Sequence, residues 1–292
     1  MRTRTVAKKD LAEIQEEDWV DSQRRPYVTG ATAYMPVKEG FPFDCEIIER
    51  RQYHGRGFFM LGDVAVIHGR KPSHQDIERM VNVRHPKGIL WIRSLHDHTR
   101  TPESEVVYGE VGEVYHLENN LIYIFDPQKV MFAQGNLEEK RRMADLIRKS
   151  GKNQRVADMY AGIGYFTIPM ADCGAMVHAM EINPVAFGYL ERNVLENGLS
   201  LRVQATCGDC RDLLSGTYDR IVMGHFDAIT MLPQALEHIR SGSAIHLHSL
   251  GSVESEIHSQ LARAGFSAEI HVHKVKKYRP HTWHVVQDVM IA

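Results

Sequence analysis

The sequence contains few cysteines, and their spacing does not match a zinc site. Only four occur among 292 residues, and a single pair, Cys207 and Cys210, has the Cys-x-x-Cys spacing. A structural zinc site normally needs a second such pair, or histidines at a matched spacing. We therefore predict no bound metal and ordinary reduced thiols.

Long apolar runs are also missing. The longest ones, such as Leu121–Phe125, are far too short to cross a bilayer. Residues 1–4 are mostly polar and partly basic, and no apolar stretch follows them, so a secretory signal is not expected. We predict a cytoplasmic monomer that does not associate with membranes.

The net charge lacks the basic excess that is typical of nucleic-acid-binding proteins. It is −2, from 35 Lys and Arg against 37 Asp and Glu, with the 17 histidines counted as neutral. Basic clusters nevertheless occur at residues 24–25, 50–51, 140–142 and 274–279. Because each cluster could simply be a solvated surface, charge alone neither identifies nor excludes an RNA partner.

The first half of the chain predicts a small α+β unit. Hydrophobic residues make up 43% of the whole sequence, which is enough for a globular core. Pro26, Pro36 and Pro42 interrupt any long element near the N-terminus. Further on, apolar patterns predict strands within 58–67, 88–94 and 113–125 and a helix at 75–83. A charged helix is expected from about residue 135 to 150.

The second half alternates between strands and helices. The predicted strands are 155–158, 175–181, 201–206, 220–223 and 244–248, and a helix follows Asn183, its expected N-cap. Such alternation predicts a parallel, doubly wound sheet. The last two strands, 268–275 and 283–291, are consecutive and form an antiparallel hairpin. This α/β arrangement fits a class I S-adenosylmethionine (SAM)-dependent methyltransferase fold better than a flavodoxin-like one.

These patterns predict four segments. An N-terminal segment of unknown role covers residues 1–50. A small α+β domain covers residues 51–135, and a linker helix covers residues 136–152. A SAM-binding Rossmann-like catalytic domain covers residues 153–292.

The strongest motif is Asp-Met-Tyr-Ala-Gly-Ile-Gly-Tyr-Phe-Thr at residues 158–167, where a strand turns into a helix. Its glycines allow a tight turn and a close approach to a ligand. Glu181 ends the next strand, where a carboxylate can bind both ribose hydroxyls of a nucleoside. Asp209 follows the third strand and can reach an adenine amino group, and the backbone of Cys210 can meet the adenine ring.

A dinucleotide site is the main rival for this motif. Its fingerprint needs a third glycine at the position of Thr167, and that glycine is absent. The combination of the loop with carboxylates at three strand ends favours SAM as the co-substrate.

The motif at 158–167, together with Glu-Ile-Asn-Pro at 181–184, resembles two related families that modify tRNA. These are the tRNA guanine N1-methyltransferases that act next to the anticodon and the wybutosine-pathway aminocarboxypropyl transferases. The resemblance runs from about residue 57 to the end of the chain. It includes Gly-Asp-Val at 62–64, Arg-Thr-Pro-Glu at 100–103 and His-Leu-Glu-Asn at 116–119.

Two segments favour the transferases over the methyltransferases. Met223-Gly224-His225 is similar to the transferases' Met-Gly-Tyr, where the methyltransferases have Asn-x-Pro. Gly135-Asn136 is similar to the transferases' Gly-Asn, where the methyltransferases have Ser-Pro-Arg. The chain departs from the transferase pattern at Ala133, which replaces Ser, and at Lys140, which replaces Arg. Lys140 keeps the charge but loses the bidentate fork of Arg.

The resemblance implies that the following residues bind SAM: Ala133, Lys140, Arg142, Asp158, Tyr160, Gly162, Gly164, Glu181, Ile182, Asp209, Cys210, Met223 and Gly224. Lys140 or Arg142 would hold the carboxylate of the methionine end. His225 and Asp227, which follow the fourth strand, are candidates for the catalytic base. For Trp283 and His284 we favour packing within the sheet over stacking on a base.

The resemblance therefore implies an enzyme that transfers the 3-amino-3-carboxypropyl group of SAM to a carbon of a wyosine-type, tricyclic guanine base. That base would lie 3′ of the anticodon in tRNA-Phe, and methylthioadenosine would be released. One alternative is a tRNA guanine N1-methyltransferase. The other is a SAM- or RNA-binding module without catalytic activity.

Overall fold

The computed structural model describes residues 1–47, 57–96, 100–151 and 153–292. Its contacts divide the chain into two compact units, Met1–Gly55 with Arg79–Arg84, and Arg56–Glu78 with His85–Ala292. The predicted boundaries at residues 50, 135 and 152 stay predictions, and the basic cluster at 50–51 lies outside the described residues. Among the described residues, no helix combines the length and apolar character needed to cross a membrane.

The first unit contains a small four-stranded sheet of order β2-β3-β1-β4. Its strands are β1 (Arg2–Ala7), β2 (Tyr27–Thr29), β3 (Thr32–Pro36) and β4 (Cys45–Glu46), and all pairs are antiparallel. One helical turn, η1 (Lys8–Asp10), and the short helix α1 (Leu11–Ile14) follow β1. The strands are short, as the spacing of the prolines predicts, and β3 ends at Pro36 itself.

The second unit begins with a four-stranded sheet of order β5-β6-β7-β8. Its strands are β5 (Phe59–Leu61), β6 (Val64–His68), β7 (Gly88–His96) and β8 (Thr101–Gly109), and α2 (His74–Arg84) lies between β6 and β7 in the sequence. A hairpin of β9 (Val114–Glu118) and β10 (Leu121–Phe125) follows. The predicted strands and helix are confirmed, but β8 was not predicted, because its residues are largely polar and exposed.

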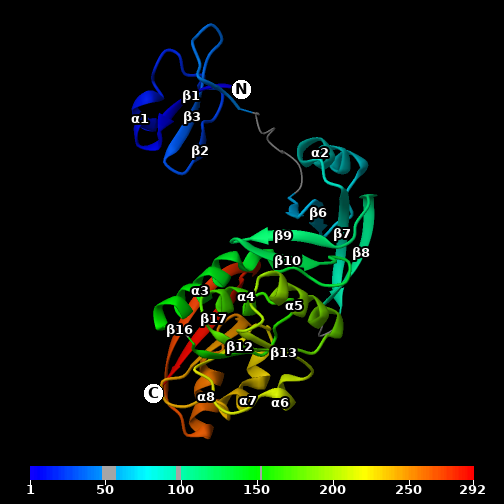
Figure 1. The fold of residues 1–292 in the computed structure, drawn as a ribbon, viewed down its shortest axis with the longest axis vertical. Coiled ribbons are helices and arrows are strands. Elements are labelled where there is room, and N and C mark those ends of the chain that lie inside the picture. Colours follow the sequence, from blue (N-terminus) through cyan, green and yellow to red (C-terminus); the bar gives the residue numbers. More distant parts are fainter. Residues whose placement is uncertain (48–56, 97–99, 152) are drawn as a thin grey trace. The chain divides into compact units, whose positions relative to one another are not determined.

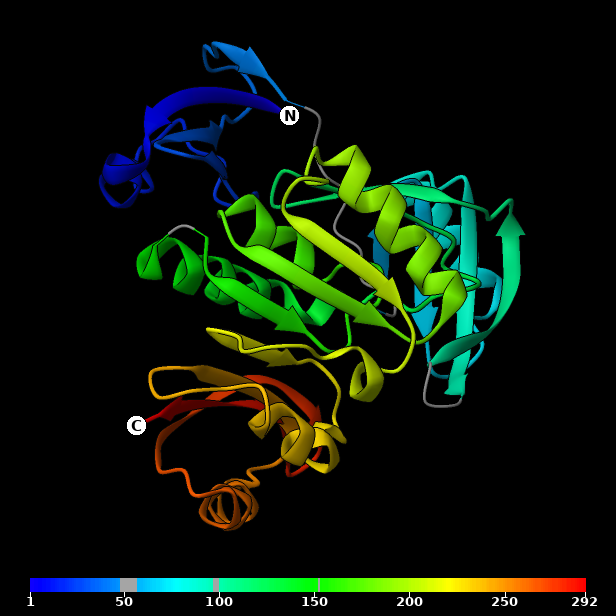
Figure 2. The same ribbon diagram turned by 60° about the horizontal axis from the view of Figure 1, so that its bottom comes forward.

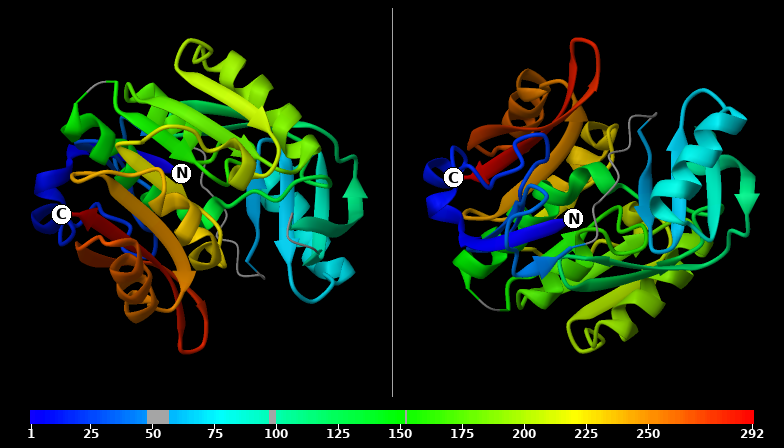
Figure 3. Two further views of the ribbon diagram at one scale, coloured as in Figure 1. Left: turned by 90° about the horizontal axis from the view of Figure 1, so that it is seen from below. Right: turned by 90° about the horizontal axis from the view of Figure 1, so that it is seen from above.

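A seven-stranded sheet follows in the same unit. Its strands are β11 (Arg155–Asp158), β12 (Met176–Glu181), β13 (Val203–Cys207), β14 (Arg220–Met223), β15 (Ala244–Leu250), β16 (Ala268–Arg279) and β17 (Thr282–Ile291). The order is β13-β12-β11-β14-β15-β17-β16. The first five strands are parallel, and β17 runs antiparallel to both of its neighbours. The predicted doubly wound sheet with an antiparallel C-terminal hairpin is confirmed, and Figure 3 shows the hairpin at one edge.

Helices cover both faces of this sheet (Figures 1 and 2). One face carries α3 (Leu137–Ser150), α4 (Thr167–Asp172) and α5 (Pro184–Glu196), and the other carries α6 (Cys210–Leu213), α7 (Leu232–Leu236) and α8 (Glu254–Ala264). Neighbouring strand residues alternate between the faces, so that Val156 belongs to the first core and Ala157 to the second. The carboxyl ends of the parallel strands therefore meet at one edge, where the site is built.

Strands β15 and β17 bury three histidines beside that edge. His248 and His284 share a hydrogen bond of 2.9 Å between Nδ1 and Nε2, and His246 Nδ1 lies 2.6 Å from Asp288 Oδ1. All three are at most 1% exposed. Burial lowers the pKa of His246 and His248, and it lowers the pKa of His284 to about 4. The three rings are therefore neutral near pH 7.

The buried histidines predict acid sensitivity. Below about pH 6.5 the unfolded chain binds protons that the folded chain refuses, so each histidine removes up to ~1.4 kcal/mol of stability per pH unit. We expect the free energy of unfolding, measured with urea from pH 7 to pH 5, to fall less steeply for His248→Gln than for the unsubstituted protein. His258→Gln, on the exposed side of α8, is the matched control and should not change the slope. Equal slopes for His248→Gln and the unsubstituted protein would count against buried neutral histidines.

Candidate functional site

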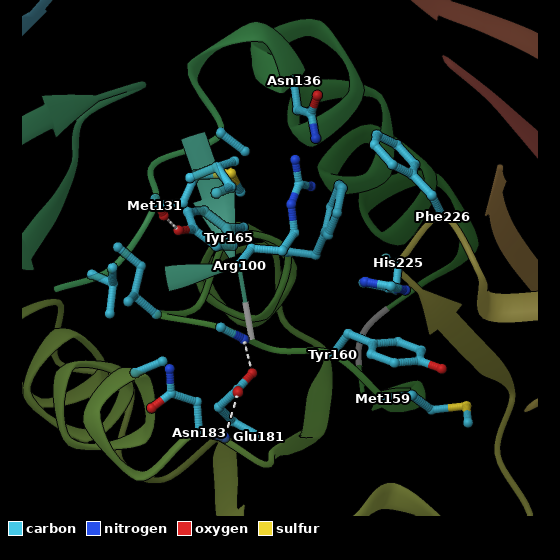
Figure 4. Close-up of a pocket in the computed structure, with 18 of the residues that line it drawn as sticks. Arg100, Met131, Asn136, Met159, Tyr160, Tyr165, Glu181, Asn183, His225 and Phe226 are labelled. Carbon is cyan, nitrogen blue, oxygen red and sulfur yellow. Dashed lines mark hydrogen bonds between the residues drawn. The ribbon is translucent and has the colours of Figure 1, made fainter. Parts of the chain in front are cut away.

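A cavity of about 880 Å³ opens at the carboxyl ends of the parallel strands. Its wall combines the loops after β11, β12, β13 and β14 with the turn η2 (Gln134–Asn136) and residues of β5, β6, β16 and β17. Figure 4 shows part of this wall, with Asn136, Glu181 and His225 among the labelled side chains. The volume is within the usual range for small-molecule sites, roughly 300–1,000 Å³.

Two glycines shape the loop between β11 and α4. Gly162 has φ +57° and Gly164 has φ +100°, both in the left-handed region that glycine adopts without strain. A Cβ at Gly162 would lie 2.6 Å from the Tyr165 ring, and one at Gly164 would lie 2.6 Å from Ile168 Cδ1. Gly162 lines the cavity, whereas Gly164 packs the loop against the helices behind it.

Glu181, at the end of β12, connects this loop to the next helix. Its Oε2 accepts a hydrogen bond from Gly162 N at 2.7 Å, and its Oε1 accepts one from Asn183 N at 2.7 Å (Figure 4). Burial raises the pKa of this carboxyl, and the backbone N–H groups oppose that shift. Each carboxylate oxygen has further lone-pair capacity, so Glu181 can also accept hydrogen bonds from two hydroxyl groups of a ligand.

Asp209 stands at the corresponding place after β13. Its Oδ1 accepts a hydrogen bond of 2.9 Å from Arg211 N and so caps α6. The hydrogen bonds from Arg211 lower the pKa of Asp209, which keeps it an acceptor. Asp209, Cys210 and Ile182 all line the cavity, as predicted for the adenosine end of a nucleoside.

The segment after β14 forms another wall. Gly224, His225 and Asp227 line the cavity, and the ring of His225 stacks on Tyr160 at a centroid distance of 5.5 Å. His225 Nδ1 accepts a hydrogen bond from Asp227 N at 3.2 Å and lies 3.9 Å from Asp227 Oδ2. The side chain of Asp227 is 80% exposed, so its carboxylate is the more solvated of the two base candidates.

Several predicted residues lie behind the wall. Asp158 is fully buried and accepts a hydrogen bond of 2.7 Å from Thr167 Oγ1, which ties β11 to the start of α4. Burial raises the pKa of Asp158 to about 6. Met223 is part of the core on the face of α6–α8. These two residues support the site from outside the cavity wall.

The cations predicted to hold a carboxylate are already paired. Lys140 is 1% exposed, and its Nζ lies 2.6 Å from Glu118 Oε1 and 4.5 Å from the centre of the Phe132 ring. The guanidinium of Arg142 lies 2.7 Å from Glu139 and 2.5 Å from Asp288. Neither residue lines the cavity, although Ala133 does. The structure therefore does not bring Lys140 or Arg142 together with the other predicted ligands.

A second group of wall residues was not predicted to bind SAM. This group contains Arg100, Phe226, Lys276, Tyr278 and His284. The Arg100 guanidinium lies 5.2 Å from the centre of the Phe226 ring, and Phe226 meets His284 edge-on at 5.0 Å. Arg100 belongs to the Arg-Thr-Pro-Glu segment of the family resemblance, but sequence alone does not show that the residue before β8 meets strand β17 at one cavity.

The cavity thus has two chemically different regions. One offers carboxylates and backbone groups suited to a nucleoside, and the other offers cations and aromatic rings suited to an anion or a nucleobase. Among the described residues, no cluster of three or more His, Cys, Asp or Glu is arranged to hold a metal ion.

A family model described as the TRM5/TYW2 methyltransferase domain matches residues 114–276. A protein of Methanocaldococcus jannaschii named tRNA(Phe) (4-demethylwyosine(37)-C(7)) aminocarboxypropyltransferase is 34% identical over 241 residues, which cover 78% of this chain and 95% of that protein. A protein of the same name from Pyrococcus horikoshii is 31% identical over 246 residues, which cover 79% of this chain and 87% of that protein.

Solved structures are similar as well. The crystal structure of P. horikoshii TYW2 in complex with MeSAdo has a TM-score of 0.69 and 29% identity, covering 81% of this chain and 90% of that one. Trm5b from Pyrococcus abyssi has a TM-score of 0.74 and covers 99% of both chains, but its 24% identity shows the fold alone.

The Lys140–Glu118 pair can be tested as a structural element. Lys140→Met leaves a buried carboxylate without its cation, and we expect the free energy of unfolding to fall by ~3–5 kcal/mol. Lys140→Met combined with Glu118→Leu should recover most of that loss, because both charges are then removed together. Urea denaturation measures both effects, and Arg141→Met, an exposed cation on the same helix, is the control. If the Lys140→Met protein instead kept its normal stability but lost its affinity for SAM, Lys140 would be a SAM ligand and not a structural residue.

Proposed function

We propose a function from one premise: the chain belongs to the TRM5/TYW2 methyltransferase-domain family. It is an RNA-modifying enzyme that transfers the 3-amino-3-carboxypropyl group of SAM to a carbon of a tricyclic, wyosine-type guanine base in tRNA. The base is the one 3′ of the anticodon in tRNA(Phe), and the by-product is methylthioadenosine. The monomeric state and the cytoplasmic location stay predictions.

The choice of this reaction depends chiefly on the extent of the match to the aminocarboxypropyltransferases. Sequence identity of 34% extends over 95% of one such protein and of 31% over 87% of another. Likeness to the Trm5 structures, at 20–24% identity, supports only the shared fold. The name of the relatives specifies position 37 of tRNA(Phe) and carbon 7 of 4-demethylwyosine, and we propose the same acceptor here.

The nucleoside region of the cavity fits the adenosine part of SAM. Glu181 has acceptor capacity for the two ribose hydroxyls, and Asp209 is a carboxylate acceptor for the adenine amino group. Gly162 provides backbone without a side chain beside them. The residues proposed to contact SAM directly are Ala133, Tyr160, Gly162, Glu181, Ile182, Asp209, Cys210 and Gly224, all of which line the cavity.

SAM supplies a carbon that is activated by a sulfonium leaving group. A new bond forms between the acceptor carbon of the base and the γ-carbon of the methionine chain, while the S–Cγ bond breaks and its electron pair stays on sulfur. The acceptor carbon must then lose its proton so that the ring regains its aromatic character. His225 is the proposed recipient of that proton, because it lines the cavity and its Nδ1, which accepts a hydrogen bond from Asp227 N, carries the lone pair of the neutral ring.

Isotope labelling separates the proposed reaction from methyl transfer. SAM labelled in the carboxyl carbon, incubated with tRNA that carries the wybutosine precursor, should transfer its label to tRNA and release methylthioadenosine. SAM labelled in the methyl group should leave its label in methylthioadenosine, because only the aminocarboxypropyl group is transferred. Methyl label that enters unmodified tRNA, with S-adenosylhomocysteine as by-product, would identify a guanine N1-methyltransferase.

Glu181→Ala provides the binding control for that experiment. It removes charged hydrogen bonds, so we expect SAM affinity to fall by ~1.5–3 kcal/mol in calorimetry and product formation to fall with it. Glu191→Ala removes the same charge from the exposed side of α5, and it should change neither SAM affinity nor product formation. A protein that binds SAM but modifies no tRNA would favour the binding-module alternative.

A further inference from the structure

The methionine end of SAM carries a carboxylate that needs a cation. The two cations predicted for this role are paired elsewhere, Lys140 with Glu118 and Arg142 with Glu139 and Asp288. A carboxylate that enters the cavity must therefore be neutralised by another residue of its wall, because an unpaired charge in such a site is unfavourable.

Lys276 is a half-buried residue of the cavity wall. No ion pair or side-chain hydrogen bond joins its ammonium group to any residue in the described part of the chain. Burial lowers the pKa of this lysine, and the nearby charges of Arg100 and Lys140 lower it further. Lys140 is neutralised by Glu118, so the positive charge left over on this side of the cavity belongs to Lys276 and Arg100.

A β-bulge directs Lys276 towards the cavity. In the pairing of β16 with β17, Lys274 lies opposite Val285 and Lys276 lies opposite His284, so Val275 is the extra residue. Bulges of this kind change the direction of a side chain and are frequent beside active sites. Lys277, the next residue on β16, is exposed and does not line the cavity.

Gly135 makes room for this ammonium group. A Cβ at Gly135 would lie 2.6 Å from Lys276 Nζ and 2.9 Å from its Cδ, so any side chain there would displace the lysine. The next residue, Asn136, also lines the cavity, and its buried Oδ1 has no hydrogen-bond partner among the described residues. Figure 4 shows Asn136 and Arg100 extending into the same region of the cavity. A buried amide oxygen that accepts no hydrogen bond is unfavourable. A ligand amine that donates a hydrogen bond to this oxygen would remove that cost.

We propose that Lys276 and Asn136 bind the amino-acid end of SAM: the Lys276 ammonium pairs with the α-carboxylate, and the Asn136 side-chain amide accepts a hydrogen bond from the α-ammonium. This site deepens the proposed function and rests on it. By fixing the far end of the chain, the two residues leave the γ-carbon, rather than the methyl group, as the carbon presented to the acceptor. Both act as positioning residues.

Calorimetry with two ligands tests the assignment. Lys276→Met should weaken SAM binding by ~10- to 100-fold, the scale of a lost charge-assisted hydrogen bond. It should leave the affinity for methylthioadenosine, which has no amino-acid end, unchanged. Lys276→Arg should restore most of the SAM affinity. Lys277→Met, which removes the same charge one residue away and outside the cavity, should affect neither ligand.

Gly135→Ala is a second, independent variant. It keeps the lysine but displaces its ammonium group, and we expect the same selective loss of SAM affinity. This variant decides the question if Lys276→Met does not fold.

Three results would overturn the site. The first is an unchanged SAM affinity in both variants, and the second is an equal loss for SAM and methylthioadenosine. In the third, Lys276→Met weakens only tRNA binding and reduces its salt dependence, which would make the lysine a phosphate contact. Failure of the proposed function has a different signature, because the unsubstituted protein would then bind no SAM or would add only a methyl group to tRNA.

Discussion

The carboxylate of Glu181 is the contact on which the nucleoside region depends. It joins the glycine loop after β11 to the N-terminus of α5 by accepting hydrogen bonds from Gly162 and Asn183. Parallel strands bring these two loops to the same edge of the sheet, but the shared carboxylate fixes the distance between them. The same group has acceptor capacity left for a ligand, so the contact that organises the loops also forms the binding surface.

The distribution of charge explains how one cavity can bind both a nucleoside and an amino acid. Carboxylates lie at the ends of β12 and β13, where hydroxyl and amino groups must be recognised. The cations predicted or found near the methionine end fall into two classes. Lys140 and Arg142 are neutralised within the protein, whereas Lys276 has no partner among the described residues. A ligand carboxylate can supply the anion that Lys276 lacks.

Much of the second unit could be predicted from sequence, because its signals are local. Strand-to-helix alternation predicts the parallel sheet. Glu181 and Asp209 were found because Glu181 ends β12 and Asp209 comes two residues after the end of β13. The role of Lys140 could not be predicted, since its partner Glu118 lies 22 residues away on β9. Lys276 was missed because a bulge in β16 has no sequence signal comparable to a glycine loop. In the first unit the polar, proline-interrupted pattern concealed a four-stranded sheet.

The central claim is that this cavity presents the γ-carbon of the methionine chain, and not the methyl group, to the acceptor base. The crystal structure of the protein with bound SAM tests it most directly. We expect Glu181 to bind the ribose hydroxyls, Lys276 to pair with the α-carboxylate, and the γ-carbon to face the open space beside Gly224 and His225. A pose in which the methyl group faces that space, with the carboxylate away from Lys276, would contradict it.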